Sequence, residues 1–241
     1  MSSNPAALQF DGTDDHVEVP ASTAWSTVSA ASPLSASFWF YPTRMGGTGP
    51  DPTLSTMLLS DNTRADGGFQ LPDSWWSEYY QDGALVFMLW TGGGTAYSVY
   101  SQVPTLTQWI HVDGAYDGTT QKLFVDGQVV ASATPSVSLS VGSRKVMIGS
   151  GVCPVDSNNY DCRAGFFEGR IDEIAIWNVA RTDAQIAAGT ATRLQGSESG
   201  LVAYWRLDDG SGTSAADSTG SGHTRTLVNG PSWTNSVSPV Q

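Results

Sequence analysis

The sequence predicts an all-β fold, a sandwich of two antiparallel sheets with one short helix. Its apolar runs are short and lie between clusters of Gly, Asp, Ser and Pro, a pattern typical of strands joined by turns. Gly is abundant, at 26 residues, and helix signals are scarce. With 241 residues, 40% of them hydrophobic, the chain is long enough to bury the core of one large β domain.

The first predicted strands lie near the N-terminus. Leu8–Phe10 and Val17–Val19 each carry an apolar pair, and Asp11–Gly12 predicts a turn between them. Ser35–Tyr41 is nearly unbroken in its apolar and aromatic character, which is typical of a central strand covered on both faces. Pro42 is expected to end it.

In the middle of the chain the first strand signals are weak and the later ones are stronger. Thr56–Ser60 and Phe69–Leu71 are short candidate strands. Pro72–Gly83 is rich in aromatics but has neither helical nor strand periodicity, so we interpret it as a loop. Ala84–Trp90 and Ala96–Ser101 predict a hairpin around a run of glycines.

A second group of strands follows. Trp109–Tyr116 and Leu123–Val125 are predicted strands, and Asp126–Gly127 is a strong signal for a two-residue hairpin turn. Lys145–Gly149 is a further strand.

The most informative stretch begins at Phe166. Ile174 and Ile176 alternate along one face of an extended segment. Strict alternation places Asp172 on the same face. A carboxylate on an apolar face needs a partner, and a hard cation is a natural one.

A short helix is expected directly after this strand, near residues 182–189. Thr182 stands three residues before Gln185, which is the spacing of a capping box. Gly189 is a suitable helix end.

The C-terminal part predicts one more strand and an ordered loop. Leu201–Leu207 is the strand, and Gly210–His223 is the loop. Residues from Ser232 onward are interpreted as a loosely attached end or the beginning of a linker. We therefore expect a single domain over residues 6–232, with terminal extensions at 1–5 and 233–241.

Several of these segments together resemble a known family. The pattern G-x-I-D-E-x-x-I-W-N-x-A-R-T-x-x-x-I, and the order of LQFDGTDDHVEV, WIHVDGAYDG, LFVDGQVV and LVAYWRLDDGSGTSAADSTGSGH, are similar to those of laminin-G-like, concanavalin A-like domains of the lectin/glucanase superfamily. The resemblance covers nearly the whole chain. It implies a jelly-roll sandwich and a secreted or cell-surface protein.

The resemblance also implies a structural calcium site. Asp11, Gly12 and Asp172 match positions that hold calcium in similar domains, and Asp14 and Asp15 are further candidate ligands. Calcium takes several oxygen ligands at about 2.3–2.6 Å. The alternative is that these aspartates accept hydrogen bonds from backbone amides or an arginine, and cap turns.

Aromatic and amide-rich stretches predict a glycan site. Sugars stack their C–H faces on Trp and Tyr, and their hydroxyls bind to Asp, Asn and Gln. The predicted stacking residues are Trp75, Trp76, Tyr79 and Tyr80, and the predicted hydroxyl ligands are Asp156, Asn158, Asn159 and Asp161. The alternative is that the tryptophans close an open end of the sandwich.

The two cysteines indicate the compartment of the protein, and its net charge limits the class of partner. The spacing of Cys153 and Cys162 differs from that of CxxC metal or redox motifs. We interpret them as a local disulfide in an oxidising compartment; the alternative is two free thiols. The net charge of −12 argues against nucleic acid as a partner. No apolar run approaches eighteen residues, so membrane insertion is not expected.

Catalysis has little support in the sequence. The E-x-D-x-x-E pattern of similar glucanases is absent, and His111 in WIHV matches a framework position of the resembled family. We predict a non-catalytic, calcium-stabilised domain that binds a glycan or polysaccharide within a larger secreted or cell-surface protein. The alternatives are a laminin-G-type module that binds a cell-surface protein, and a polysaccharide hydrolase or lyase.

Overall fold

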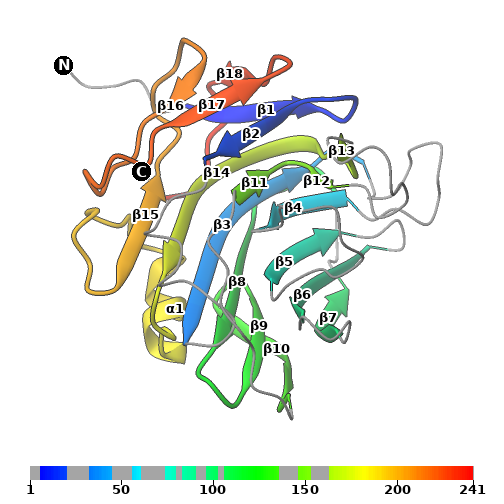
Figure 1. Ribbon diagram of the computed structural model, residues 1–241, viewed down its shortest axis with the longest axis vertical. Coiled ribbons are helices and arrows are strands. Elements are labelled where there is room, and N and C mark those ends of the chain that lie inside the picture. The colour runs from blue at the N-terminus through cyan, green and yellow to red at the C-terminus, as the bar shows by residue number, and fades with distance from the viewer. Residues whose placement is uncertain are drawn as a thin grey trace.

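The computed structural model describes residues 6–20, 33–44, 56–60, 74–79, 83–90, 96–102, 106–135, 146–152 and 163–240. Within these ranges the chain forms two large sheets that face each other and one short helix (Figure 1). Every strand pair among the described residues is antiparallel. The predicted jelly-roll sandwich is therefore confirmed.

The first sheet contains the strand β14 and its neighbours. Its order is β10 (Gln128–Ala133), β9 (Gln121–Val125), β8 (Ile110–Tyr116), β3 (Leu34–Pro42), β14 (Glu168–Trp177), β1 (Ala7–Asp11) and β18 (Ser232–Thr234), and β15 (Leu201–Trp205) pairs with the C-terminal half of β14. The first and last strands of the chain, β1 and β18, thus pair directly, and β1 also pairs with β14.

The second sheet contains the remaining long strands. Its order is β16 (Ser214–Ala215), β17 (Arg225–Val228), β2 (His16–Val19), β11 (Val146–Ile148), β4 (Thr56–Ser60), β5 (Ser74–Tyr79), β6 (Ala84–Trp90) and β7 (Ala96–Gln102). A separate two-stranded ladder joins β12 (Gly151–Val152) to β13 (Arg163–Ala164).

The hydrophobic core lies between the two sheets. Phe38 and Phe40 of β3 and Ile174 of β14 enter it from the first sheet, and Val17 and Phe87 enter it from the second. Each of these side chains is at most 2% exposed. Burial of such apolar surface is the main favourable term in folding. The face of the first sheet that looks away from this core is called the outer face below.

The predicted hairpin and helix are both confirmed. Asp126 and Gly127 have φ angles of 47° and 76°, as a two-residue turn with two left-handed residues requires. The helix α1 spans Asp183–Gly189, and Thr182 and Gln185 form the reciprocal bonds of a capping box. No described helix is both long and apolar enough to cross a membrane.

Packing of α1 covers part of the outer face. Ile186, the buried residue of the helix, contacts Phe124 of β9 and Ala115 of β8. The three side chains form a small apolar cluster that is separate from the main core. They hold α1 against the sheet from the side opposite the main core.

Two expectations about the fold are wrong. Ser74–Tyr79 was expected in a loop but forms β5, an interior strand between β4 and β6.

Residues from Ser232 were expected to be a loose end and residues 233–241 an extension. Instead β18 pairs with β1, Arg170 donates to Ser236 Oγ at 3.0 Å, and Ser238 is 2% exposed. The domain therefore extends through residue 240 of the described chain.

Candidate functional site

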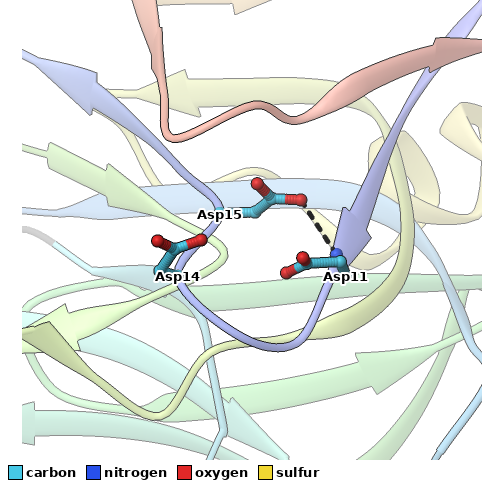
Figure 2. Close-up of side chains that lie close together, drawn as sticks. All are labelled: Asp11, Asp14 and Asp15. Atoms are coloured by element: carbon cyan, nitrogen blue, oxygen red, sulfur yellow. Dashed lines mark hydrogen bonds between the residues drawn. The ribbon is translucent and has the colours of Figure 1, made fainter.

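A tight turn between β1 and β2 gathers acidic side chains. Figure 2 shows Asp11, Asp14 and Asp15 grouped at this turn, and one oxygen from each lies within 4.8 Å of the others. Gly12 makes the turn with a φ of 76°. A Cβ there would lie 2.8 Å from Glu168 Cβ, so the site requires glycine.

Hydrogen bonds fix two of the three carboxylates. The Asp11 amide donates to Asp15 Oδ2 at 3.0 Å (Figure 2), and the Thr13 amide donates to Asp11 Oδ1 at 2.8 Å. Burial raises the pKa of Asp15, and the charges of Asp11 and Asp14 raise it further. A nearby cation would relieve the repulsion among these groups.

The turn fits a calcium ion. Ligand oxygens at about 2.3–2.6 Å from one ion lie at most about 5 Å apart, and the three carboxylates meet that limit with their 4.8 Å spread. Asp14 and Asp11 are exposed and Asp15 is 4% exposed. A cation would therefore be bound at the surface, with waters or carbonyls completing its ligands.

Asp172 lies apart from this turn. The strand β14 does run beside β1, but Asp11 faces Glu168 in the register, and Asp172 is four residues further along. At about 3.3 Å per residue this separation is roughly 13 Å. The Asp172 carboxylate instead accepts hydrogen bonds from the amides of Glu173 and Ser238, each at 3.0 Å. The structure therefore separates Asp172 from the predicted ligands Asp11, Gly12 and Asp14.

A β-bulge in β14 accounts for the position of Asp172. Asp172 pairs with Trp39 and Ala175 pairs with Ser37, so β14 has one residue more than β3 over this interval. The extra residue is Glu173, whose φ of 53° is left-handed.

The bulge changes which residues face the core. Ile171 and Ile174 both belong to the core between the sheets, although they are three residues apart. Asp172, paired with Trp39, lies on the outer face. The expectation that Asp172 shares a face with Ile174 and Ile176 is wrong, because the inserted residue interrupts the alternation.

Glu173 is the centre of a buried charged network on the outer face. The Tyr204 hydroxyl donates to Glu173 Oε2. Arg193 Nη2 lies 2.6 Å from Glu173 Oε1 and 2.5 Å from Asp208 Oδ2. Burial raises the pKa of Glu173, and the hydrogen bonds and charge of Tyr204 and Arg193 oppose that rise. Burial and the negative charge of Glu173 also raise the pKa of Asp172.

A second buried group adjoins the first. His111 Nδ1 lies 2.9 Å from Asp113 Oδ2, and Arg181 Nη1 lies 3.5 Å from Asp113 Oδ1. The His111 ring contacts that of Trp39, with centroids 4.9 Å apart. His111 is 4% exposed and Asp113 is fully buried. Contacts within the fold therefore hold these side chains.

The carboxyls of Asp172 and Glu173 in β14 are poorly placed for catalysis. Asp172 is 1% exposed and Glu173 is 6% exposed. Each accepts hydrogen bonds from groups of the fold. A general acid or base must lie within hydrogen-bond reach of its substrate, which these two carboxyls are not.

An open cleft lies beside α1. Its volume is about 460 Å³, which falls within the usual range for ligand pockets. It lies between the β8–β9 turn and the start of the helix, and its lining is Ala115, Asp117, Thr120, Lys122, Ala180, Arg181, Thr182, Asp183 and Ala184. Alanines leave space and apolar surface, and the remaining residues offer hydroxyl and charged groups.

The charges of the cleft balance. Lys122 Nζ lies 2.8 Å from Asp183 Oδ1. Asp117 Oδ1 accepts hydrogen bonds from the amides of Thr119 and Thr120 at 2.8 and 2.6 Å. With Arg181, the lining contains equal numbers of acidic and basic residues. An uncharged polar ligand suits such a lining better than an ionic one.

The structure tests little of the predicted glycan site. Tyr80, Asp156, Asn158, Asn159, Asp161, Cys153 and Cys162 lie outside the described residues. Residues 75, 76 and 79 lie in β5, where the backbone alone is described. The predicted stacking role of Trp75, Trp76 and Tyr79 therefore stays a prediction.

Sequence reasoning missed the buried network and the cleft. Adjacent Asp172 and Glu173 in an otherwise apolar strand were a visible signal, but Arg193, Tyr204 and Asp208 carry no pattern that joins them to it. The cleft depends on how α1 meets the β8–β9 turn, which no local motif predicts.

Comparison with known proteins agrees with this fold. A protein of Bacteroides ovatus ATCC 8483, described as carbohydrate binding, superposes with a TM-score of 0.66 at 16% identity, covering 96% of this chain and 60% of that one. A native heptameric SAP-like pentraxin of Limulus polyphemus gives a TM-score of 0.52 at 16% identity, covering 78% of this chain and 83% of that one. Domains LG4-5 of the mouse laminin α1 chain give a TM-score of 0.52 at 16% identity, covering 71% of this chain and 40% of that one.

Sequence comparison identifies a relative that matches part of the chain, and a family. Pappalysin-1 of Mus musculus is 30% identical over 91 residues, which are 36% of this chain and 5% of that protein. The chain thus spans a small fraction of that relative's length. A model of the concanavalin A-like lectin/glucanases superfamily matches residues 11–187, and the chain therefore belongs to that superfamily.

Proposed function

We propose that this domain is a non-catalytic module that binds a neutral glycan within a larger secreted or cell-surface protein. The observation that carries the proposal is the charge-balanced cleft of about 460 Å³ beside α1. The fold likeness to a carbohydrate-binding protein over 96% of the chain supports it. The burial of Asp172 and Glu173 supports a role without catalysis.

Sugar recognition needs both polar and apolar contacts. Thr120, Lys122 and Asp183 would bind hydroxyls, and the three alanines of the lining would contact C–H faces. The predicted stacking residues, and the acidic and amide residues of 156–161, remain part of the proposal.

Calcium is proposed to stabilise the domain at Asp11, Asp14 and Asp15. The ion would neutralise the three carboxylates and tie the end of β1 to the start of β2. In this role it would stabilise the fold and would not contact the glycan in the cleft, which is built from other strands.

A glycan array on the intact chain, with and without a chelator, tests the function. Binding of one class of neutral glycan is expected, and Asp183→Asn with Lys122→Met should reduce affinity at least tenfold, which corresponds to about 1.4 kcal/mol. Asp209→Asn, an exposed acid outside the cleft, is the matched control and should leave affinity unchanged. Release of new reducing ends from a polysaccharide would replace the proposal with an enzyme.

A protein partner is the second candidate. Tyr100 of β7 and Val129 and Val130 of β10 are 69%, 44% and 40% exposed, and β7 and β10 contact each other at one side of the sandwich. Exposed apolar groups at adjoining strand edges favour a protein surface as partner. If Tyr100→Ser abolishes binding to cells while the cleft variants do not, adhesion replaces glycan recognition.

A further inference from the structure

A small cavity lies on the outer face of the first sheet, apart from the α1 cleft. Its volume is about 20 Å³, and a cavity of roughly 10–15 Å³ on this measure already holds one water. Ser37, Trp39 and His111 line it from the sheet, and Glu173 lines it from the bulge. The cover is the segment after α1, with Arg193, and the C-terminal Val240.

Two donors at this cavity lack protein acceptors. Trp39 is 5% exposed, and its indole Nε1 has no hydrogen-bond partner; Arg193 Nε is likewise buried without one. A buried donor that is left unpaired costs about 1–3 kcal/mol. Two such donors on residues of one cavity therefore indicate an acceptor that the protein itself does not provide.

The cavity also contains a protein group that can accept a hydrogen bond from whatever molecule accepts from these two donors. Glu173 Oε1 lies 2.6 Å from Arg193 Nη2, and an ionised carboxylate has about four lone-pair positions, so it can accept a further bond. The Tyr204 hydroxyl occupies the other oxygen, Oε2.

The mixture of donors and acceptor selects the ligand. A metal cation would face the N–H groups of Trp39 and Arg193, which repel it. An anion would face Glu173. A water molecule accepts two hydrogen bonds and donates two, and buried waters typically make about three.

We propose that the cavity binds one structural water, which accepts hydrogen bonds from Trp39 Nε1–H and Arg193 Nε–H and donates one to the Glu173 carboxylate. This water joins three segments that are distant in sequence: β3, the bulge of β14 and the connection between α1 and β15. It thereby holds the covering segment on the outer face.

Crystallography and NMR of the intact chain test the proposal. A high-resolution map should show one density peak within hydrogen-bond distance of Trp39 Nε1 and Glu173. In solution the Trp39 indole hydrogen should give a cross peak to water that has the sign of the diagonal in NOESY and the opposite sign in ROESY, as a long-lived bound water does. Trp39→Phe identifies that signal by its loss, and Trp109→Phe, at a half-buried position, is the control that should retain it.

A pair of variants at Ser37 tests whether the water depends on the volume of the cavity. Ser37 lines the cavity and is 3% exposed. Ser37→Val should fill the cavity, remove the density peak and lower the melting temperature, whereas Ser37→Ala should retain the water. A dry cavity in the wild-type map, or a peak bound only to carboxylate oxygens at metal distances, overturns the proposal.

Discussion

The hydroxyl of Tyr204 donates a hydrogen bond to the carboxylate of Glu173 beneath the segment that follows α1. The Glu173 side chain comes from a bulge in β14, and Tyr204 comes from the strand β15 that pairs with the far half of β14. Both side chains are buried. The bond therefore satisfies a carboxylate that the bulge has placed away from bulk solvent.

Removing that hydroxyl should destabilise the fold. Tyr204→Phe leaves the buried Glu173 with one donor fewer, and hydrogen bonds to charged groups contribute about 1.5–3 kcal/mol. We expect a loss of about 2 kcal/mol in the free energy of unfolding, measured by urea denaturation. Tyr100→Phe, at a side chain that is 69% exposed, should change it by less than about 0.5 kcal/mol. Equal losses in both variants would contradict the assigned bond.

Asp172 should make stability fall as pH rises. Burial raises its pKa well above the unfolded value of 3.8, so the folded protein binds a proton more tightly than the unfolded chain does. Stability linked to this group is therefore gained as pH falls through the folded pKa, and the gain is complete below 3.8. Unfolding free energies measured across that window should show this gain for the wild type and lack it for Asp172→Asn.

Asp217 provides a contrasting pH dependence. Burial alone would raise its pKa, but hydrogen bonds from Thr219 and the amides of His223 and Tyr204 outweigh burial and lower it. Its contribution to stability is present above the unfolded pKa and is lost as pH falls through the folded one. Asp217→Asn should therefore reduce the loss of unfolding free energy as pH falls into the acid range. Asp172→Asn should increase that loss.

Calcium should stabilise the chain through the β1–β2 turn. A ligand present at 100 times its Kd adds about 2.7 kcal/mol to stability, so EDTA should lower the melting temperature of the wild type. Asp14→Asn should abolish that response, and Asp172→Asn should retain it because Asp172 lies outside the acidic turn. Loss of the response in Asp172→Asn alone would place the ion in β14 instead.

The capping box should stabilise α1 measurably. Thr182→Ala removes the oxygen that accepts from the Gln185 amide at 3.2 Å, and such a loss typically costs about 1 kcal/mol. Thr182→Ser keeps the oxygen and should retain most of the stability. Thermal or urea unfolding compares the three chains directly.

Local patterns predicted much of the fold. The turn at Asp126–Gly127 and the box at Thr182–Gln185 were visible because each motif lies within four residues of sequence. The bulge was not visible, because its left-handed residue is Glu173 and not a glycine. Nor was the amide of Ser238 that binds Asp172, because a contact across 66 positions leaves no local pattern.

The candidate site was predictable only in part. Asp11, Asp14 and Asp15 share one turn, so their proximity follows from sequence. The inclusion of Asp172 relied on strict alternation, which the bulge breaks. β5 escaped detection because neither face of SWWSEY is uniformly apolar, and alternation is the signal that identifies a strand.

Glu173 is an added residue, since β14 keeps its pairing with β3 on both sides of it. A chain from which this one position had been deleted would retain both flanking registers and both isoleucine contacts with the core. It would nevertheless lack the anchor for Arg193 and Tyr204. The one residue that the bulge adds to β14 is thus the residue that binds Arg193 and Tyr204 across the outer face.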